Sequence, residues 1–362
     1  MKKQIIAFAL GALTLLGASA QNTSKLTATK ANEYGLIYTL PLTAFNVTIA
    51  AEKTVKTPGE FYQYAKKYLN ADPILAPSVS WRIIEAAIEQ TAFPDEQERY
   101  LVTLKNGSGA FVTVSDDNFP ISLNDEAYRW SPVVNLPEAK KARPTILQLP
   151  IARQAVTPEM IQSKSSAKRA ELAAAKIYEL RNMRSEIISG QADAMPSDGA
   201  AMKLALDQIA SQEEALTAMF LGTVQTSTEV RTYNVDIPAE GAPERRVLAR
   251  LSMVDGLVAP DDLSGSPIYV TVSPQTRGAL PVNDKGMTKS FPKGGVAYRI
   301  PGTGLVSVSF DGKTLVGGTY DVAQYGVVFG LDPSLFTSRK SPSYLHFNPL
   351  TGAIRELGTI NK

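Results

Sequence analysis

Residues 165–190 read SSAKRAELAAAKIYELRNMRSEIISG, and this stretch carries a strong helical pattern. Its apolar side chains recur at steps of three or four, which places them along one face, while charged side chains occupy the other faces. Upstream, Thr157-Pro158-Glu159 supplies a capping residue, a first-turn proline and a first-turn carboxylate. Gly190 is a suitable C-terminal stop. The sequence therefore predicts a long helix from Thr157 to about Ser189.

A second helix is predicted directly downstream. The turn-forming residues Pro196–Gly199 offer a new cap, and apolar side chains then recur at helical steps from Met202 to Phe220, before Gly222. Each of the two helices would present one apolar stripe. We therefore expect residues 151–222 to form an antiparallel helical hairpin that packs on a neighbouring domain or partner.

Strand-like patterns lie on both sides of this helical segment. Residues 21–150 contain alternating runs rich in β-branched and aromatic residues, one short helical stretch from Thr57 to Leu69, and a proline-containing linker at 132–150. Residues 223–362 alternate in short runs, with Asp311-Gly312 as a preferred turn. The sequence thus predicts an α+β fold in which two β-rich segments, 21–150 and 223–362, flank a long antiparallel helical hairpin.

The first twenty residues have the pattern of a secretory signal peptide. Lys2 and Lys3 precede an apolar run that closes on Ala18-Ser19-Ala20. The run is shorter than the roughly twenty residues that a membrane-spanning helix needs. We therefore expect cleavage between Ala20 and Gln21 and export to the periplasm or the outer membrane.

Composition restricts the classes of partner and cofactor. Cysteine is absent, so disulfides, thiol nucleophiles and thiolate metal sites are excluded. Loss of the two signal-peptide lysines would reduce 37 basic residues to 35, equal to the 35 acidic residues. This balance does not indicate nucleic-acid binding. No segment after the signal peptide predicts a transmembrane helix, while peripheral association with a membrane through a local basic patch or docking face stays open.

Several ordered motifs resemble one protein family. They are Gly35–Pro41, Ile177–Arg181, Tyr298–Pro301, Gln324–Gly326 and Phe347–Pro349. Together they resemble an uncharacterised secreted family from Bacteroidales known as domain of unknown function 4831. The resemblance covers nearly all of the mature chain and implies an envelope location in a Gram-negative anaerobe. It implies no activity and no catalytic residue.

Catalytic chemistry has little support in the sequence. His346 is the only histidine, and its place on an alternating strand favours a hydrogen-bonded structural role. No zinc-ligand pattern, catalytic constellation or cofactor motif is present. The carboxylate pairs Asp95-Glu96, Asp116-Asp117 and Asp261-Asp262 leave one alternative open, a glycan-binding module or a carboxylate-dependent glycan hydrolase.

Arg181 and Arg184 are the candidate interaction residues. They lie one turn apart on the first predicted helix, where two guanidinium groups could grip a carboxylate or phosphate of a partner. Ordinary salt bridging within the chain is the competing explanation. The sequence thus favours a non-enzymatic, cofactor-free envelope protein with a structural or protein-interaction role and an unidentified envelope protein as partner.

Overall fold

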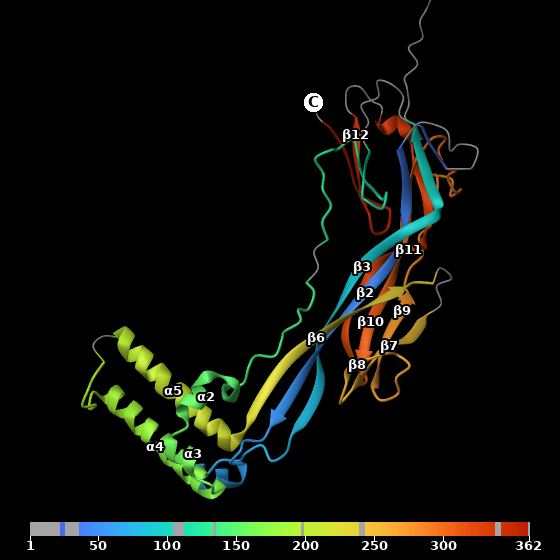
Figure 1. Cartoon of the computed structure of the whole chain (residues 1–362). Helices are drawn as coiled ribbons and strands as arrows, with labels where there is room; N and C mark the ends of the chain where they lie inside the picture. The colour runs from blue at the N-terminus through green and yellow to red at the C-terminus, as the bar shows by residue number, and fades with distance from the viewer. Residues whose placement is uncertain are drawn as a thin grey trace, which may run out of the picture.

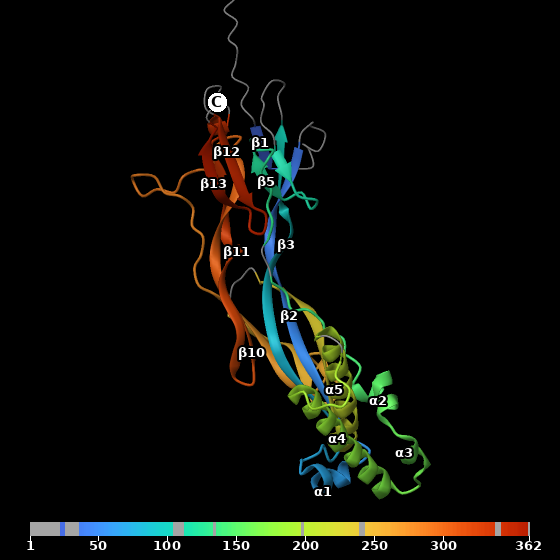
Figure 2. The same cartoon turned by 90° about the vertical axis from the view of Figure 1, so that its left-hand side faces the viewer.

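The structure is a computed structural model. It describes residues 22–25, 36–103, 112–132, 135–196, 199–238, 243–336 and 342–360. The predicted signal peptide and its cleavage point between Ala20 and Gln21 lie outside these residues. The molecule is elongated, with a body of long strands and a lobe of helices at one end (Figures 1 and 2).

Sheet 1 is built around a long antiparallel pair of strands, to which two further strands are added. Its strands, in spatial order, are β1 (Asn22–Lys25), β3 (Ser78–Thr103), β2 (Leu36–Thr57) and β6 (Thr223–Asp236). Strand β2 continues through Pro41, which lies opposite Pro94 at a shift in the register of β2 and β3. Because proline lacks an N–H donor, such an irregularity is where a strand tolerates it.

Sheets 2 and 3 complete the body. Sheet 2 contains, in spatial order, β11 (Lys313–Leu331), β10 (Val296–Phe310), β9 (Ser266–Pro274), β7 (Glu244–Ser252) and β8 (Gly256–Val258). Sheet 3 contains β13 (Ala353–Thr359), β12 (Ser343–Asn348), β5 (Pro120–Leu123) and β4 (Val112–Val114). The 3₁₀ helix η4 (Pro333–Phe336) precedes β12. The predicted turn at Asp311-Gly312 is confirmed, since it joins β10 to β11.

Sheets 1 and 2 pack face to face as a β-sandwich. Alternate side chains of β2, such as Phe45, Val47 and Ile49, are fully buried against the inner face of sheet 2, which contributes Val270 and Val308. This two-residue period follows from the pleat, which sends successive side chains to opposite faces of a sheet. A separate apolar cluster that includes Leu345 and Phe347 packs sheet 3 against the upper end of β10.

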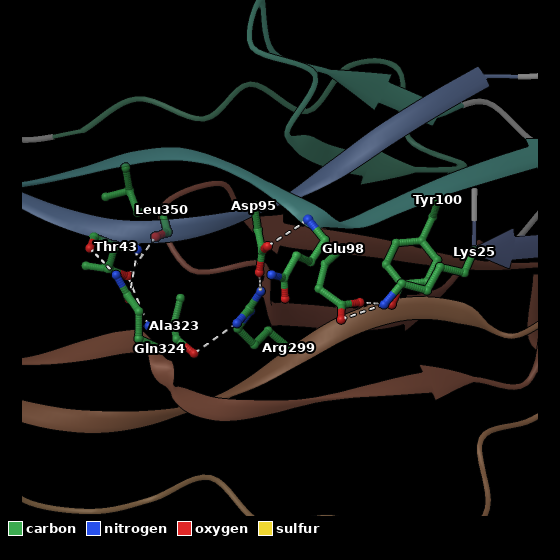
Figure 3. A network of polar contacts seen from close by, with 10 residues as sticks. Lys25, Thr43, Asp95, Glu98, Tyr100, Arg299, Ala323, Gln324 and Leu350 are labelled. Atoms are coloured by element: carbon green, nitrogen blue, oxygen red, sulfur yellow. Dashed lines mark hydrogen bonds and ion pairs between the residues drawn. The ribbon is translucent and has the colours of Figure 1, made fainter. Parts of the chain in front are cut away.

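A buried ion pair also joins the two sheets (Figure 3). Arg299 of β10 donates from Nη2 to Asp95 Oδ2 of β3 at 2.7 Å and from Nη1 to the carbonyl of Ala323 at 3.2 Å. Nearby, Thr43 of β2 donates from Oγ1 to the carbonyl of Leu350, and the same oxygen accepts from the amide of Ala323. These polar contacts fix where the sandwich meets the turn between β12 and β13.

The helices form a lobe at the end of sheet 1. It contains η2 (Tyr62–Tyr64), α1 (Ala65–Leu69), η3 (Ile146–Gln148), α2 (Pro150–Ala155), α3 (Pro158–Gln162), α4 (Ser166–Ser189) and α5 (Gly199–Leu221). The predicted helix from Thr157 to Ser189 is divided into α3 and α4, because Ser165 caps a new helix by accepting from the amide of Lys168. Its predicted end is confirmed, since Gly190 adopts the left-handed conformation after Ser189.

The predicted fold class is wrong. Of the described residues, 46% lie in strands and 24% are helical, in three sheets and a lobe of several helices, so no long antiparallel helical hairpin flanked by two β-rich segments is present. Strand β6 follows the helices in sequence but completes sheet 1, and β12 and β13 complete sheet 3 with β4 and β5. The protein is therefore a β-rich fold in which both β-rich segments share sheets.

Candidate functional site

An open groove of about 640 Å³ lies where the helical lobe meets sheet 1. Three parts of the chain form it: the end of the linker at Pro144–Ile146, helices α4 and α5, and the junction Gly222–Val224 that leads into β6. Arg181 and Arg184 line the groove from α4. The two arginines that the sequence singled out thus lie at a concave surface.

Both arginines bind one carboxylate. Arg181 donates from Nε to Glu213 Oε1 at 2.6 Å, and Arg184 Nη1 lies 2.9 Å from Glu213 Oε2. The Glu213 side chain is 12% exposed, whereas the two arginine side chains are 40% and 41% exposed. Each guanidinium carries five N–H donors, so most donors of Arg181 and Arg184 do not contact the one carboxylate that they share. The exposed part of each guanidinium can therefore donate to a second carboxylate.

The groove carries charges of both signs. Glu214, the next residue on α5, is exposed and also lines it. No ion pair among the described residues includes Glu214. With Arg181, Arg184 and Glu213, the four formal charges sum to zero, but they are arranged as a cationic pair beside a separate anion. This pattern suits a protein segment that itself carries charges of both signs.

Neighbouring contacts hold the groove in shape. The guanidinium of Arg181 lies 5.5 Å from the ring centre of Tyr178, whose hydroxyl donates to the carbonyl of Tyr68 at 2.9 Å. Next to the lining residues Pro144 and Val224, Gln225 of β6 donates from Nε2 to the carbonyl of Arg143 at 2.7 Å. The linker is thereby fastened to β6, the edge strand of sheet 1, beside the groove.

The family model described as a domain of unknown function (DUF4831) matches residues 34–355. The chain belongs to this family. The match spans the strands of the sandwich, the helical lobe and the groove, and it confirms the family that the motifs indicated. Secretion and an origin in Bacteroidales stay predictions. Comparison with curated proteins and with solved structures found no match.

The described residues also bear on membranes and metals. Among the described helices, none combines the length and the hydropathy needed to cross a membrane. Within the same described ranges, histidine, cysteine and carboxylate side chains do not gather in threes in an arrangement for a metal ion.

His346 belongs to a polar cluster on sheet 3. It is 7% exposed, its Nε2 lies 2.8 Å from Asp125 Oδ2, and its Nδ1 lies 3.4 Å from Glu356 Oε2. The ring stacks on Tyr128 at 3.7 Å between centres. Both ring nitrogens face carboxylates, and the hydroxyl of Ser122, which pairs with His346 across the strands, donates instead to the carbonyl of Asp125. The histidine is therefore hydrogen-bonded within the fold.

Acid should weaken this cluster. The hydrogen bond with His346 is the main cause that holds the pKa of Asp125 below its usual value of 3.8. A depressed folded-state pKa stabilises the fold above the unfolded value, and this contribution is lost as pH falls through the folded value. We expect Asp125→Asn to lower the free energy of unfolding by about 1 kcal/mol at pH 7. Urea unfolding from pH 7 to pH 2 should show this difference shrink below about pH 4.

Asp117→Asn is the matched control, because Asp117 is exposed in the turn between β4 and β5. Its unfolding curve should follow that of the wild type at each pH. A constant difference between Asp125→Asn and the wild type down to pH 2 would show that the contact with His346 does not depend on the carboxylate charge.

The carboxylate pairs considered for glycan chemistry lie apart from the groove. Asp116 and Asp117 are exposed, as are Asp261 and Asp262. Asp95 is held by Arg299, as described above. The carboxylate that the sequence analysis missed is Glu213. The sequence places three acidic residues, Asp207, Glu213 and Glu214, on the second predicted helix, and each could have paired with the arginines. Only the rotation of α5 against α4 determines that Glu213 does so.

Proposed function

We propose that this protein is exported to the bacterial envelope and acts there as a protein-interaction component. The proposed binding site is the groove between α4, α5 and β6. The observation that carries the proposal is the convergence of Arg181 and Arg184 on the shielded Glu213, with guanidinium surface left exposed in the groove. The signal-peptide pattern that ends at Ala20 supports export.

The proposed partner is a protein segment that presents a carboxylate to the two arginines and a basic side chain to Glu214. Planar guanidinium groups match carboxylates in a bidentate geometry, and a pair of them adds orientation. The groove is large enough to accept several side chains, since its volume of about 640 Å³ lies in the usual range for binding sites. Charges of both signs would select the partner's register more than they would raise its affinity.

Photo-crosslinking in the protein's own host tests this proposal. A photoreactive residue at Ala210, which is exposed and lines the groove, should give one discrete adduct in envelope fractions. Arg181→Gln combined with Arg184→Gln should reduce that adduct at least tenfold, because both charge-assisted contacts to the partner are removed. Mass spectrometry of the recovered protein should show Gln21 as its first residue.

Two controls separate binding from folding. Lys168→Gln combined with Lys176→Gln removes the same charge from the same helix, at residues paired locally with Glu171 and Glu179. This variant should keep the adduct. A photoreactive residue at Lys203, which is exposed on α5 and does not line the groove, should give no such adduct. Equal adducts in both double variants, with both variants folded at the assay temperature, would contradict the proposal.

A further inference from the structure

A projecting arm joins β9 to β10 and stands away from the sheets; it is the thin orange loop that extends furthest to the left in Figure 2. We define it as residues 277–293. Its tip is a tight turn in which the amide of Asn283 donates to the carbonyl of Met287 at 2.8 Å and the amide of Gly286 donates to the carbonyl of Asn283 at 2.9 Å. Val282 and Thr288 pair behind the tip. The arm thus has a defined hairpin-like shape.

The base of the arm is fastened to the body. The amide of Gly278 donates to the carbonyl of Tyr325 on β11 at 3.0 Å. A side chain at Gly278 would place its Cβ 2.0 Å from the carbonyl oxygen of Ile300, so the backbone approaches β10 as closely as glycine permits. At the other side of the base, the amide of Thr23 on β1 donates to the carbonyl of Gly294 at 3.1 Å. The body therefore holds the arm in its projecting position.

The arm exposes apolar and basic side chains together. Leu280, Val282, Met287 and Phe291 are 40%, 57%, 58% and 44% exposed. The lysines of the arm are Lys285, Lys289 and Lys293, all of them exposed, and its one acidic residue is Asp284. None of the ion pairs among the described residues includes these lysines. A chain whose overall charge is close to zero thus carries a local positive charge on a projecting apolar tip.

A groove at the base extends this surface. It has a volume of about 360 Å³ and is lined by Lys25, Tyr100, Phe291 and Lys293, among others. Lys25 also pairs with Glu98 at 2.8 Å, as Figure 3 shows. The ammonium group of Lys293 beside two aromatic rings suits an anionic headgroup whose remaining part is apolar.

We propose that the 277–293 arm and the groove at its base dock the protein on an anionic lipid surface. The lysines face the headgroup charge, and Val282 and Met287 enter the layer between headgroups and acyl chains. A folded acidic partner would need a concave surface shaped to this convex tip. A lipid surface deforms around it, and the flexible lysine stems let the ammonium groups reach the headgroups while the apolar side chains are buried.

Vesicle binding tests the proposal with the mature protein beginning at Gln21. The protein should sediment with vesicles of phosphatidylcholine mixed with phosphatidylglycerol and not with vesicles of phosphatidylcholine alone, and added salt should weaken the binding. Lys285→Gln, Lys289→Gln and Lys293→Gln together should lower the partition coefficient on the order of 100-fold, at about fivefold for each lysine. Val282→Ser with Met287→Ser should also weaken binding while its salt dependence stays.

The control removes three lysines elsewhere. Lys56, Lys164 and Lys203 are exposed, and their replacement by glutamine gives the same change in net charge. This triple variant should bind as the wild type does. Equal loss in both triple variants would reduce the effect to net charge and overturn the proposal. Retention of the protein on immobilised polyglutamate, without binding to the vesicles, would show that the arm binds an acidic protein. That result would also overturn the proposal.

Discussion

Replacing Arg299 with methionine should lower the free energy of unfolding by about 3–5 kcal/mol. The Arg299 side chain is 7% exposed and that of its partner Asp95 is 14% exposed. Methionine keeps much of the volume but leaves a buried carboxylate without its cation and the carbonyl of Ala323 without its donor. Removing one partner of a buried pair costs far more than the net contribution of the intact pair. Urea unfolding followed by far-UV circular dichroism measures the change.

Arg82→Met is the matched control. Arg82 makes an ion pair of the same length, 2.7 Å, with Glu52 on the same sheet, but its side chain is 71% exposed. Loss of such a surface pair should cost at most about 1 kcal/mol. Asp95→Asn combined with Arg299→Met should recover part of the loss, because no unpaired charge then remains buried. Equal effects of Arg299→Met and Arg82→Met would show that burial adds nothing to the Asp95–Arg299 pair.

Local patterns located many of the strands but not their lengths. Pro41 interrupts the alternating pattern of the first β-rich segment, whereas β2 runs through it from Leu36 to Thr57. A proline usually limits a strand because it cannot donate to the neighbouring strand. Here Pro41 lies opposite Pro94 at a register shift, and neither residue reveals that partner in its own sequence context.

The error in fold class has a similar cause. Strand β6 pairs with β2 from Thr57↔Thr223 to Ala44↔Asp236, although more than 150 residues separate the partners in the chain. A two-residue period shows which face of a strand is buried, but it does not show which strand lies beside it. The helices between β3 and β6 thus resembled an independent hairpin, because the pairing that closes sheet 1 across them leaves no local pattern.

Only the arginine pair of the candidate site could be predicted from the sequence. The three-residue spacing of Arg181 and Arg184 places both on one face of a helix, and both contact Glu213, which is the salt bridging within the chain that the sequence left as the competing explanation. Contact with a partner stays a prediction. The acceptor, the linker wall and the groove depend on how α5 and residues 144–146 pack against α4. These are long-range contacts, and single-sequence periodicity carries no information about them.

Gly222→Ala should lower the free energy of unfolding by roughly 2–6 kcal/mol and also disturb the groove. Gly222 joins α5 to β6 at φ +88°, and an added Cβ would lie 2.3 Å from the carbonyl oxygen of Thr57 and 3.1 Å from the amide nitrogen of Gly59. Left-handed strain contributes about 1–3 kcal/mol, and overlap with atoms that cannot rotate away contributes about 1–3 kcal/mol more. Thermal and urea unfolding measure the loss.

Gly190→Ala separates strain from overlap. Gly190 ends α4 at φ +72°, yet among the described residues no atom beyond its chain neighbours lies within 4 Å of the position that an added Cβ would take, so this variant should lose only about 1 kcal/mol. Near Gly222, α5 is tied to the connection between β2 and β3, since the amide of Phe61 donates to the carbonyl of Met219 and that of Ile74 to the carbonyl of Leu221. Movement at this junction shifts α5, and with it Glu213, relative to β6. We therefore expect Gly222→Ala, and not Gly190→Ala, to weaken the crosslink from Ala210 even at temperatures where both variants are folded; equal crosslinks would mean that the groove does not depend on this junction.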